Sequence, residues 1–167
     1  MKPLFADSFY FVALLNRADQ YHKKVASAAS QLREDIVTTD WVLMEVADAL
    51  AESAFRRSVP QFIRDLAADP KVKLVRASKE LFEHGLQLYQ DRPDKEWTLT
   101  DCISFVVMTE EELTDALTGD SHFEQAGFKA MFAWLQPHPV ESLITVFVHG
   151  ISESPLVCEA SRPLLYP

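Results

Sequence analysis

Short apolar runs alternate along this chain with longer segments that have the periodicity of helices. The runs at 3–6 (PLFA), 36–38 (IVT), 72–76 (VKLVR) and 114–118 (TDALT) have the length and character of strands. Helices are predicted over 9–16, 19–32, 41–55, 61–69, 79–90 and 102–112, a loop over 119–127, and a final strand or turn over 128–134. This alternation predicts a parallel sheet flanked by helices, an α/β sandwich.

Four acidic residues occupy positions where such a fold would place a site. Asp7 directly follows the first predicted strand, and Asp120 follows a late strand through a glycine. Ligands of open parallel sheets bind outside the carboxyl ends of the strands, so both acids fall on the expected edge. Glu45 lies in an otherwise apolar helical stretch, and Asp101 opens the helix at 102–112. Carboxylate oxygens are the ligands that Mg²⁺ and Mn²⁺ prefer.

Each of these acids also has an ordinary structural explanation. Asp7 could cap the helix that follows it, and Asp101 could complete a capping box with an upstream threonine. Asp120 lies in a Gly-Asp turn, and Glu45 could share a solvated helix face with Asp48. The structural explanation requires four separate coincidences, whereas a metal site requires one. We therefore expect the four acids to converge, with at least one raised carboxyl pKa when no metal is bound.

Four segments carry a resemblance to a known family: FADSFYFVALLNRADQYH, TTDWVLMEVADALA, WTLTDCISFVVM and ALTGDSHFEQAGF. Together, in this order, they resemble the PIN-domain family of metal-dependent ribonucleases, which includes the VapC-type toxins of toxin–antitoxin pairs. The resemblance runs from about residue 4 to residue 132 and stops beyond about Trp134. It implies a three-layer α/β/α sandwich with a short central parallel sheet.

The same resemblance implies a site and an activity. Asp7, Glu45, Asp101 and Asp120 correspond to the four acids that line the family's metal site, so they are the expected catalytic and metal-binding residues, with Mg²⁺ or Mn²⁺ as cofactor. The implied reaction is hydrolysis of RNA by metal-activated water, which leaves a 5′-phosphate and a 3′-hydroxyl. The implied partners are the RNA substrate, a small antitoxin protein and a second copy of the chain in a homodimer.

Two other classes of function compete with this interpretation. A PIN-like module could bind RNA or protein without cutting, although all four acids are present. A phosphotransfer receiver would need an acidic pair near the first strand and a lysine after a late strand, and neither accompanies Asp7 or the ALTGD segment.

Neighbouring polar residues have more modest expected roles. Ser8 and Ser104 are expected to hydrogen-bond near the acids, and His122 is expected to be a surface loop residue. The basic residues at 23–24, 56–57 and 71–79 could line an RNA groove, although short basic stretches are usually solvated surface.

Length, composition and charge indicate the domain organisation, the cellular compartment and the tendency to bind polyanions. A chain of 167 residues can bury one full core, and we expect a nuclease domain over 1–134 followed by an extension over 135–167 with a strand-like run at 143–148 that packs on the domain or on another copy. No segment approaches the roughly 20 apolar residues that span a membrane. Cys102 and Cys158 lack CxxC spacing, which fits a reducing cytoplasm. The net charge of −9 disfavours non-specific binding of polyanions.

Overall fold

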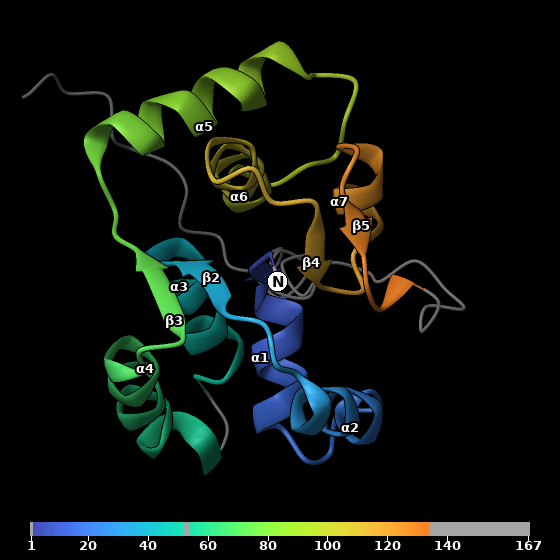
Figure 1. Ribbon diagram of the computed structural model, residues 1–167. Helices are drawn as coiled ribbons and strands as arrows, with labels where there is room; N and C mark the ends of the chain where they lie inside the picture. Colours follow the sequence, from blue (N-terminus) through green and yellow to red (C-terminus); the bar gives the residue numbers. More distant parts are fainter. Residues whose placement is uncertain (1, 52–53, 134–167) are drawn as a thin grey trace, which may run out of the picture. The chain divides into compact units, whose positions relative to one another are not determined.

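The strands form one parallel sheet in the computed structural model, which describes residues 2–51 and 54–133. Within these ranges the sheet has five strands in the order β3-β2-β1-β4-β5 (Figure 1). The strands are β1 (Leu4–Ala6), β2 (Ile36–Thr39), β3 (Val72–Val75), β4 (Asp115–Leu117) and β5 (Lys129–Ala130). The predicted extension over 135–167, with its run at 143–148, lies outside the described residues.

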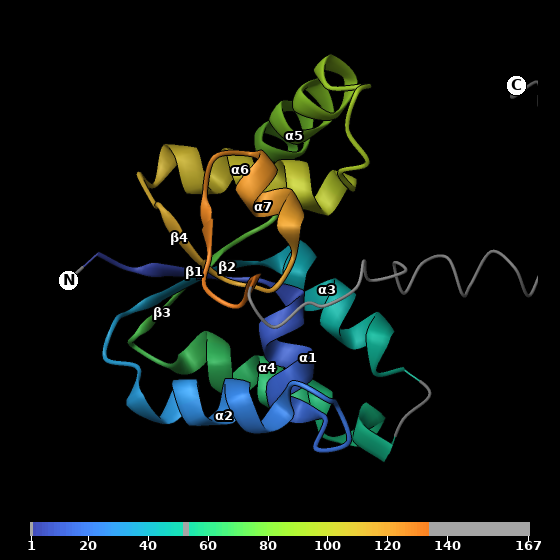
Figure 2. The ribbon, with the colours of Figure 1, turned by 90° about the vertical axis from the view of Figure 1, so that its right-hand side faces the viewer.

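Helices cover both faces of this sheet. Figure 2 shows α1, α2 and α4 on one side of the strands and α6 with α5 on the other, so the predicted three-layer α/β/α sandwich is confirmed. The helical segments are α1 (Ser8–Leu15), α2 (His22–Gln31), α3 (Asp40–Ala49), the 3₁₀ segment η1 (Ala54–Arg57), α4 (Val59–Ala68), α5 (Lys79–Asp91), α6 (Leu99–Glu110) and α7 (Ser121–Gln125).

Side-chain caps set where several helices begin. Thr39 ends β2 and accepts a hydrogen bond from the backbone N–H of Val42, so α3 starts directly at the end of the strand. Ser78 caps α5 and Thr98 caps α6 in the same way. Because each cap satisfies a backbone donor that has no partner within its helix, these three helix starts are fixed locally by the sequence.

The central strand lies in the middle of the core. Leu4, Phe5 and Ala6 are all buried, as expected for a strand with helices on both faces. Phe5 contacts Phe123 of α7, with ring centroids 6.0 Å apart, and Phe123 in turn meets Phe105 of α6 at 5.0 Å. The core therefore connects the first strand to the late segment that follows β4.

Several predicted elements differ from the structure. Residues 119–127 do not form a continuous loop, because they contain α7. The helix predicted over 41–55 ends at Ala49, and the one predicted to begin at residue 19 begins at His22. Asp19 instead accepts a hydrogen bond from the backbone N–H of Tyr21, which holds the chain in a turn before α2.

None of the helices within residues 2–51 and 54–133 has the length and apolar character that crossing a membrane requires.

Candidate metal centre

The predicted acids gather where the strand order changes direction. The chain moves from β1 through β2 to β3 on one side, then returns to place β4 on the other side of β1. Asp7 follows β1 and Asp120 lies three residues beyond β4, so both leave the sheet at the crevice between these neighbouring strands. Such a switch point is where open α/β sheets bind their ligands.

Asp7 is a buried carboxylate with an unfavourable charge. Its side chain accepts a hydrogen bond from the hydroxyl of Thr118 at 2.9 Å. A purely structural N-cap would accept a bond from a backbone N–H of α1, and within the described residues the Asp7 side chain accepts no such capping bond. Burial, together with the negative charges of Asp101 and Glu45, raises the pKa of Asp7 to about 7. The expectation of a raised carboxyl pKa is borne out here, because burial and like charges both disfavour the ionised form.

Asp101 has a capping role and also faces the other acids. Its Oδ2 accepts a 2.8 Å hydrogen bond from the backbone N–H of Thr98, which completes a capping box at the start of α6. The same oxygen lies 3.3 Å from Nδ1 of His122. The capping explanation is therefore correct for this residue, and it coexists with a position beside the other carboxylates because the cap fixes the side chain at the sheet edge.

Asp120 is the N-cap of α7. Its Oδ1 accepts a 2.8 Å hydrogen bond from the backbone N–H of His122, and its own N–H donates to Thr118 Oγ1 at 3.0 Å. Burial, followed by the charge of Asp101, raises the pKa of the Asp120 carboxyl, although the bond from His122 opposes the shift.

Glu45 reaches the same region from α3. It is half-buried, whereas Asp48, which could have shared a solvated face with it, is exposed. Burial raises the pKa of Glu45, and so do the charges of Asp101 and Asp120, against hydrogen bonds from Thr100 and Ser8. These charge effects show that Glu45 lies near acids contributed by other elements.

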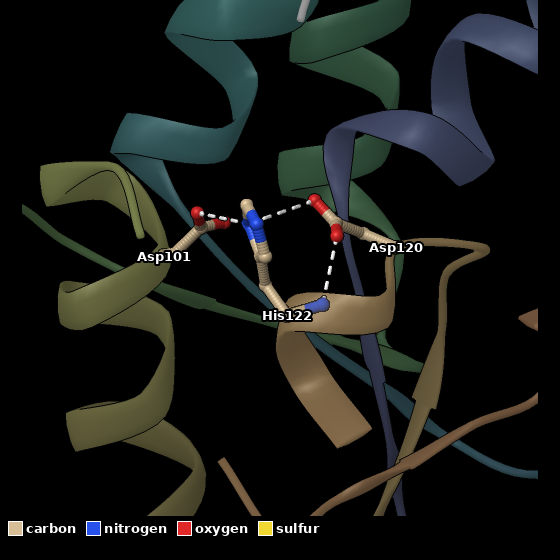
Figure 3. Close-up of side chains that lie close together, drawn as sticks. All are labelled: Asp101, Asp120 and His122. Carbon is tan, nitrogen blue, oxygen red and sulfur yellow. Dashed lines mark hydrogen bonds and ion pairs between the residues drawn. The ribbon is translucent and has the colours of Figure 1, made fainter. Parts of the chain in front are cut away.

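His122 lies between two of the carboxylates, which differs from the expected surface loop position. Its Nδ1 is 3.3 Å from Asp101 Oδ2 and 3.5 Å from Asp120 Oδ2, and Figure 3 shows the ring placed between the two acids. The hydrogen bond to Asp101 raises the pKa of His122, and the charges of Asp120 and Asp101 act in the same direction. The sequence signal that could have predicted this position is the Asp-x-His spacing at the start of a helix. An N-cap aspartate accepts a bond from the backbone N–H two residues later, which holds that residue, here His122, close to the aspartate.

The ligand atoms of Asp101, Asp120 and His122 all lie within 4.8 Å of one another, close enough to share one ion. Asp7 and Glu45 are outside this tight group, but the charge of Asp101 raises the pKa of both, so they lie within electrostatic range of it. A buried carboxylate with a pKa near 7, amid further carboxylates, is an environment that a divalent cation stabilises. The donor set of oxygens with one imidazole fits Mg²⁺ or Mn²⁺, and the nitrogen favours Mn²⁺.

The two serines predicted beside the acids differ. Ser8 Oγ donates to Asp7 Oδ1 at 3.5 Å and also bonds Glu45, as expected. Ser104 is fully buried, and its Oγ has no hydrogen-bond partner among the residues that the structure describes. The expected bond from Ser104 to the site is therefore not seen.

Comparison with solved structures identifies proteins of the same fold. VapC20 of Mycobacterium tuberculosis, a toxin that cleaves the sarcin–ricin loop, superposes with a TM-score of 0.69 at 22% identity, over 75% of this chain and 95% of that one. FitAcB from Neisseria gonorrhoeae superposes with a TM-score of 0.58 at 16% identity, over 80% of this chain and 99% of that one. A search of curated proteins gives no match.

Comparison with protein families gives a match over most of the described structure. The PIN domain family model matches residues 4–129, a range that contains all four predicted acids, His122 and every strand but the last residue of β5. With the five-stranded parallel sheet of the described residues and the structural neighbours, this extent of match leaves one assignment: the chain belongs to the PIN domain family.

Proposed function

We propose that this protein is a Mg²⁺- or Mn²⁺-dependent endoribonuclease and the toxin of a toxin–antitoxin pair. The observation that carries the proposal is the convergence of Asp7, Glu45, Asp101 and Asp120 at the β1–β4 crevice, although they are spread over more than a hundred positions of the chain. Neither a set of isolated caps nor a solvated acidic surface accounts for a buried carboxylate among three others.

Each of these side chains would have a distinct role in binding the cation. Asp7 would be a ligand whose orientation is fixed by Thr118, and Asp101 one whose position is fixed by the capping box of α6. Glu45 and Asp120 would complete the set directly or through water, and His122 adds a nitrogen to the predicted acids. A divalent ion bound there supplies an acidified water and neutralises charge on the phosphate.

The proposed reaction is hydrolysis of a phosphodiester. Water adds to phosphorus, the bond from phosphorus to the 3′-oxygen breaks, and that oxygen leaves as a hydroxyl after taking up a proton. The products are a 5′-phosphate and a 3′-hydroxyl. The acids' negative charge repels RNA in the absence of metal, so RNA cleavage should depend strictly on the divalent ion.

Cleavage of labelled RNA in Mn²⁺ tests this function. Asp7→Asn and Asp101→Asn should each abolish activity, while Asp48→Asn, at an exposed acid on the same helix as Glu45, should retain it. Titration calorimetry should likewise show weakened Mn²⁺ binding in Asp7→Asn and Asp101→Asn and retained binding in Asp48→Asn. RNA binding by the unaltered chain, without any cleavage in Mn²⁺ or Mg²⁺, would instead support a non-catalytic binding module.

The toxin role rests on the family resemblance to VapC-type toxins and on the fold shared with the VapC20 toxin. The expected partners are a small antitoxin encoded beside this chain and a second copy in a homodimer, and the expected place of action is the cytoplasm. Expression of the chain alone should arrest growth, and co-expression of the adjacent short reading frame should restore it. Growth that is unaffected by the chain despite RNA cleavage in vitro would remove the toxin role.

A further inference from the structure

The basic residues around β3 fall at two opposite edges of the sheet. Lys71 precedes the strand and Arg76 and Lys79 follow it, so the basic stretch at 71–79 does not form one continuous surface. Lys73, within the strand, forms an ion pair with Glu111. Only the residues after the strand lie on the edge that also carries the acids, because all five described strands are parallel.

The register of the sheet gives the separation. Thr39 pairs with Val75, and extending the pairing of Phe5 with Val37 by two residues places Asp7 level with Thr39. Arg76 is therefore one residue beyond the level of Asp7 and two strands away. With neighbouring strands about 4.8 Å apart, the backbone positions are roughly 10 Å from each other across the sheet.

A fixed contact holds Arg76 at this edge. Its Nη1 donates to Asp40 Oδ1 at 3.1 Å, while Asp40 Oδ2 accepts from the backbone N–H of Ala77 at 2.8 Å. The Arg76 side chain is nevertheless 72% exposed, so most of its guanidinium donors face solvent. Lys79 is also exposed but lies 3.6 Å from Glu83 of its own helix, which offsets part of its charge.

We propose that Arg76 binds a backbone phosphate of the RNA, near the cleaved bond but not at it. The inference rests on the proposed ribonuclease function and extends it to the path that the substrate takes across the sheet edge, from the β1–β4 crevice toward β3. A planar guanidinium that is anchored by one nitrogen and open at the others can bind phosphate with two parallel hydrogen bonds.

The charge balance of the chain gives this contact its importance. A net charge of −9 and the acids at the crevice both repel a polyanion, so productive binding needs local positive charge on the same edge. Asp40 offsets part of the charge of Arg76, as Glu83 does for Lys79, but the guanidinium N–H groups that do not bind Asp40 can still donate to a phosphate. The contact is independent of base identity, because it involves the backbone alone.

Steady-state cleavage of a labelled single-stranded RNA in Mn²⁺ at several NaCl concentrations tests the inference. Arg76→Ala should raise KM about threefold to fivefold, the size of one exposed ionic contact, with kcat changed less than twofold. The slope of log KM against log salt concentration should fall by about 0.7, the value for one phosphate contact on a single strand. Arg76→Lys should restore most of the salt slope because it keeps the charge.

Lys71→Ala is the matched control, since it removes one exposed charge from the opposite edge and should leave KM and the salt slope nearly unchanged. Equal effects of Arg76→Ala and Lys71→Ala, or an unchanged slope in Arg76→Ala, would overturn the inference while the nuclease function stands. If the unaltered chain cleaves no RNA, the proposed function fails. Fluorescence anisotropy with the same RNA and variants then tests the Arg76 contact separately. The slope of log Kd against log salt concentration should be about 0.7 smaller for Arg76→Ala than for the unaltered chain.

Discussion

Thr118 and Asp7, at the ends of neighbouring strands, are joined by a buried hydrogen bond of 2.9 Å from the threonine hydroxyl to Asp7 Oδ2. The same hydroxyl accepts a 3.0 Å bond from the backbone N–H of Asp120. The N–H of Asp120 occupies a lone pair of the threonine oxygen, and the hydroxyl proton of Thr118 is directed at the Asp7 carboxylate. One hydroxyl thus orients Asp7 and the backbone of Asp120 together.

Replacing this hydroxyl should weaken metal binding. Thr118→Val keeps the side-chain shape but leaves Asp7 Oδ2 and the Asp120 N–H unpaired, so we expect Mn²⁺ affinity to fall about tenfold or more and the free energy of unfolding to fall by about 1–3 kcal/mol. Calorimetric titration and urea unfolding measure the two effects. Thr109→Val, which removes a hydroxyl bonded to a backbone oxygen within α6, is the control and should leave Mn²⁺ affinity unchanged.

Without metal, stability should fall as the pH rises from about 4 to about 7. The folded protein keeps a proton on Asp7, with a pKa of about 7, that the unfolded chain releases near 3.8, so deprotonation favours unfolding across this interval. A pKa difference of about three corresponds to about 4 kcal/mol, and Tm in EDTA should be several degrees lower at pH 8 than at pH 5.

The other groups of the site whose pKa is raised, Glu45, Asp120 and His122, change stability in the same direction as Asp7. The raised pKa of His122 contributes stability below its unfolded value, which is lost as the pH rises through the folded value. Asp7→Asn should therefore flatten the pH dependence without abolishing it, and should raise Tm in EDTA at pH 8. Mn²⁺ should raise Tm of the unaltered chain at pH 8 and have much less effect on the variant. A pH-independent Tm in EDTA would contradict the assignment.

The packing of α5 on α6 leaves no room for a side chain at Gly85. A Cβ there would overlap Ile103 Cγ1 and lie 3.2 Å from the Ile103 Cα, a backbone atom that cannot rotate away. Gly85→Ala should destabilise the fold by about 1–2 kcal/mol, because the clash outweighs the gain of up to about 1 kcal/mol in helix propensity. Activity should also fall, since displacement of α6 moves Asp101.

A double-mutant cycle separates the clash from other causes. In an Ile103→Ala background the overlapping Cγ1 is gone, so Gly85→Ala should cost clearly less in urea unfolding, with a smaller cost left by the Ile103 Cα at 3.2 Å. An equal loss of stability in both backgrounds would show that the close approach of the two helices does not limit this position.

The imidazole of His122 should influence which metal the site prefers. Because nitrogen suits Mn²⁺ better than Mg²⁺, His122→Ala should lower Mn²⁺ affinity about tenfold while changing Mg²⁺ affinity much less. Calorimetric titration of both ions, in the variant and the unaltered chain, measures the ratio. His84→Ala, at an exposed histidine paired with Glu110 on α5 and α6, is the matched control. Parallel losses for both ions in His122→Ala would show that the histidine orients the acids without binding metal.

Local signals predicted most of the fold. The apolar runs at β1 to β4 and the caps at Thr39 and Thr98 are encoded within a few residues, so strand order along the chain and several helix starts follow from the sequence. Helix α7 was not predicted because its five residues follow a Gly-Asp turn and a helix of this length is not stable alone. Its stability comes from Phe123, which is fully buried against Phe5 and Phe105.

The sequence by itself determined that Asp7 and Asp120 leave their strands at the same edge, because parallel strands end on one side whatever their order. Tertiary structure decided that β4 lies beside β1, which brings Thr118 to Asp7 across 111 positions. It also decided that His122 lies between Asp101 and Asp120. Such partnerships depend on strand order and on how α7 packs, and no local pattern of residues encodes either.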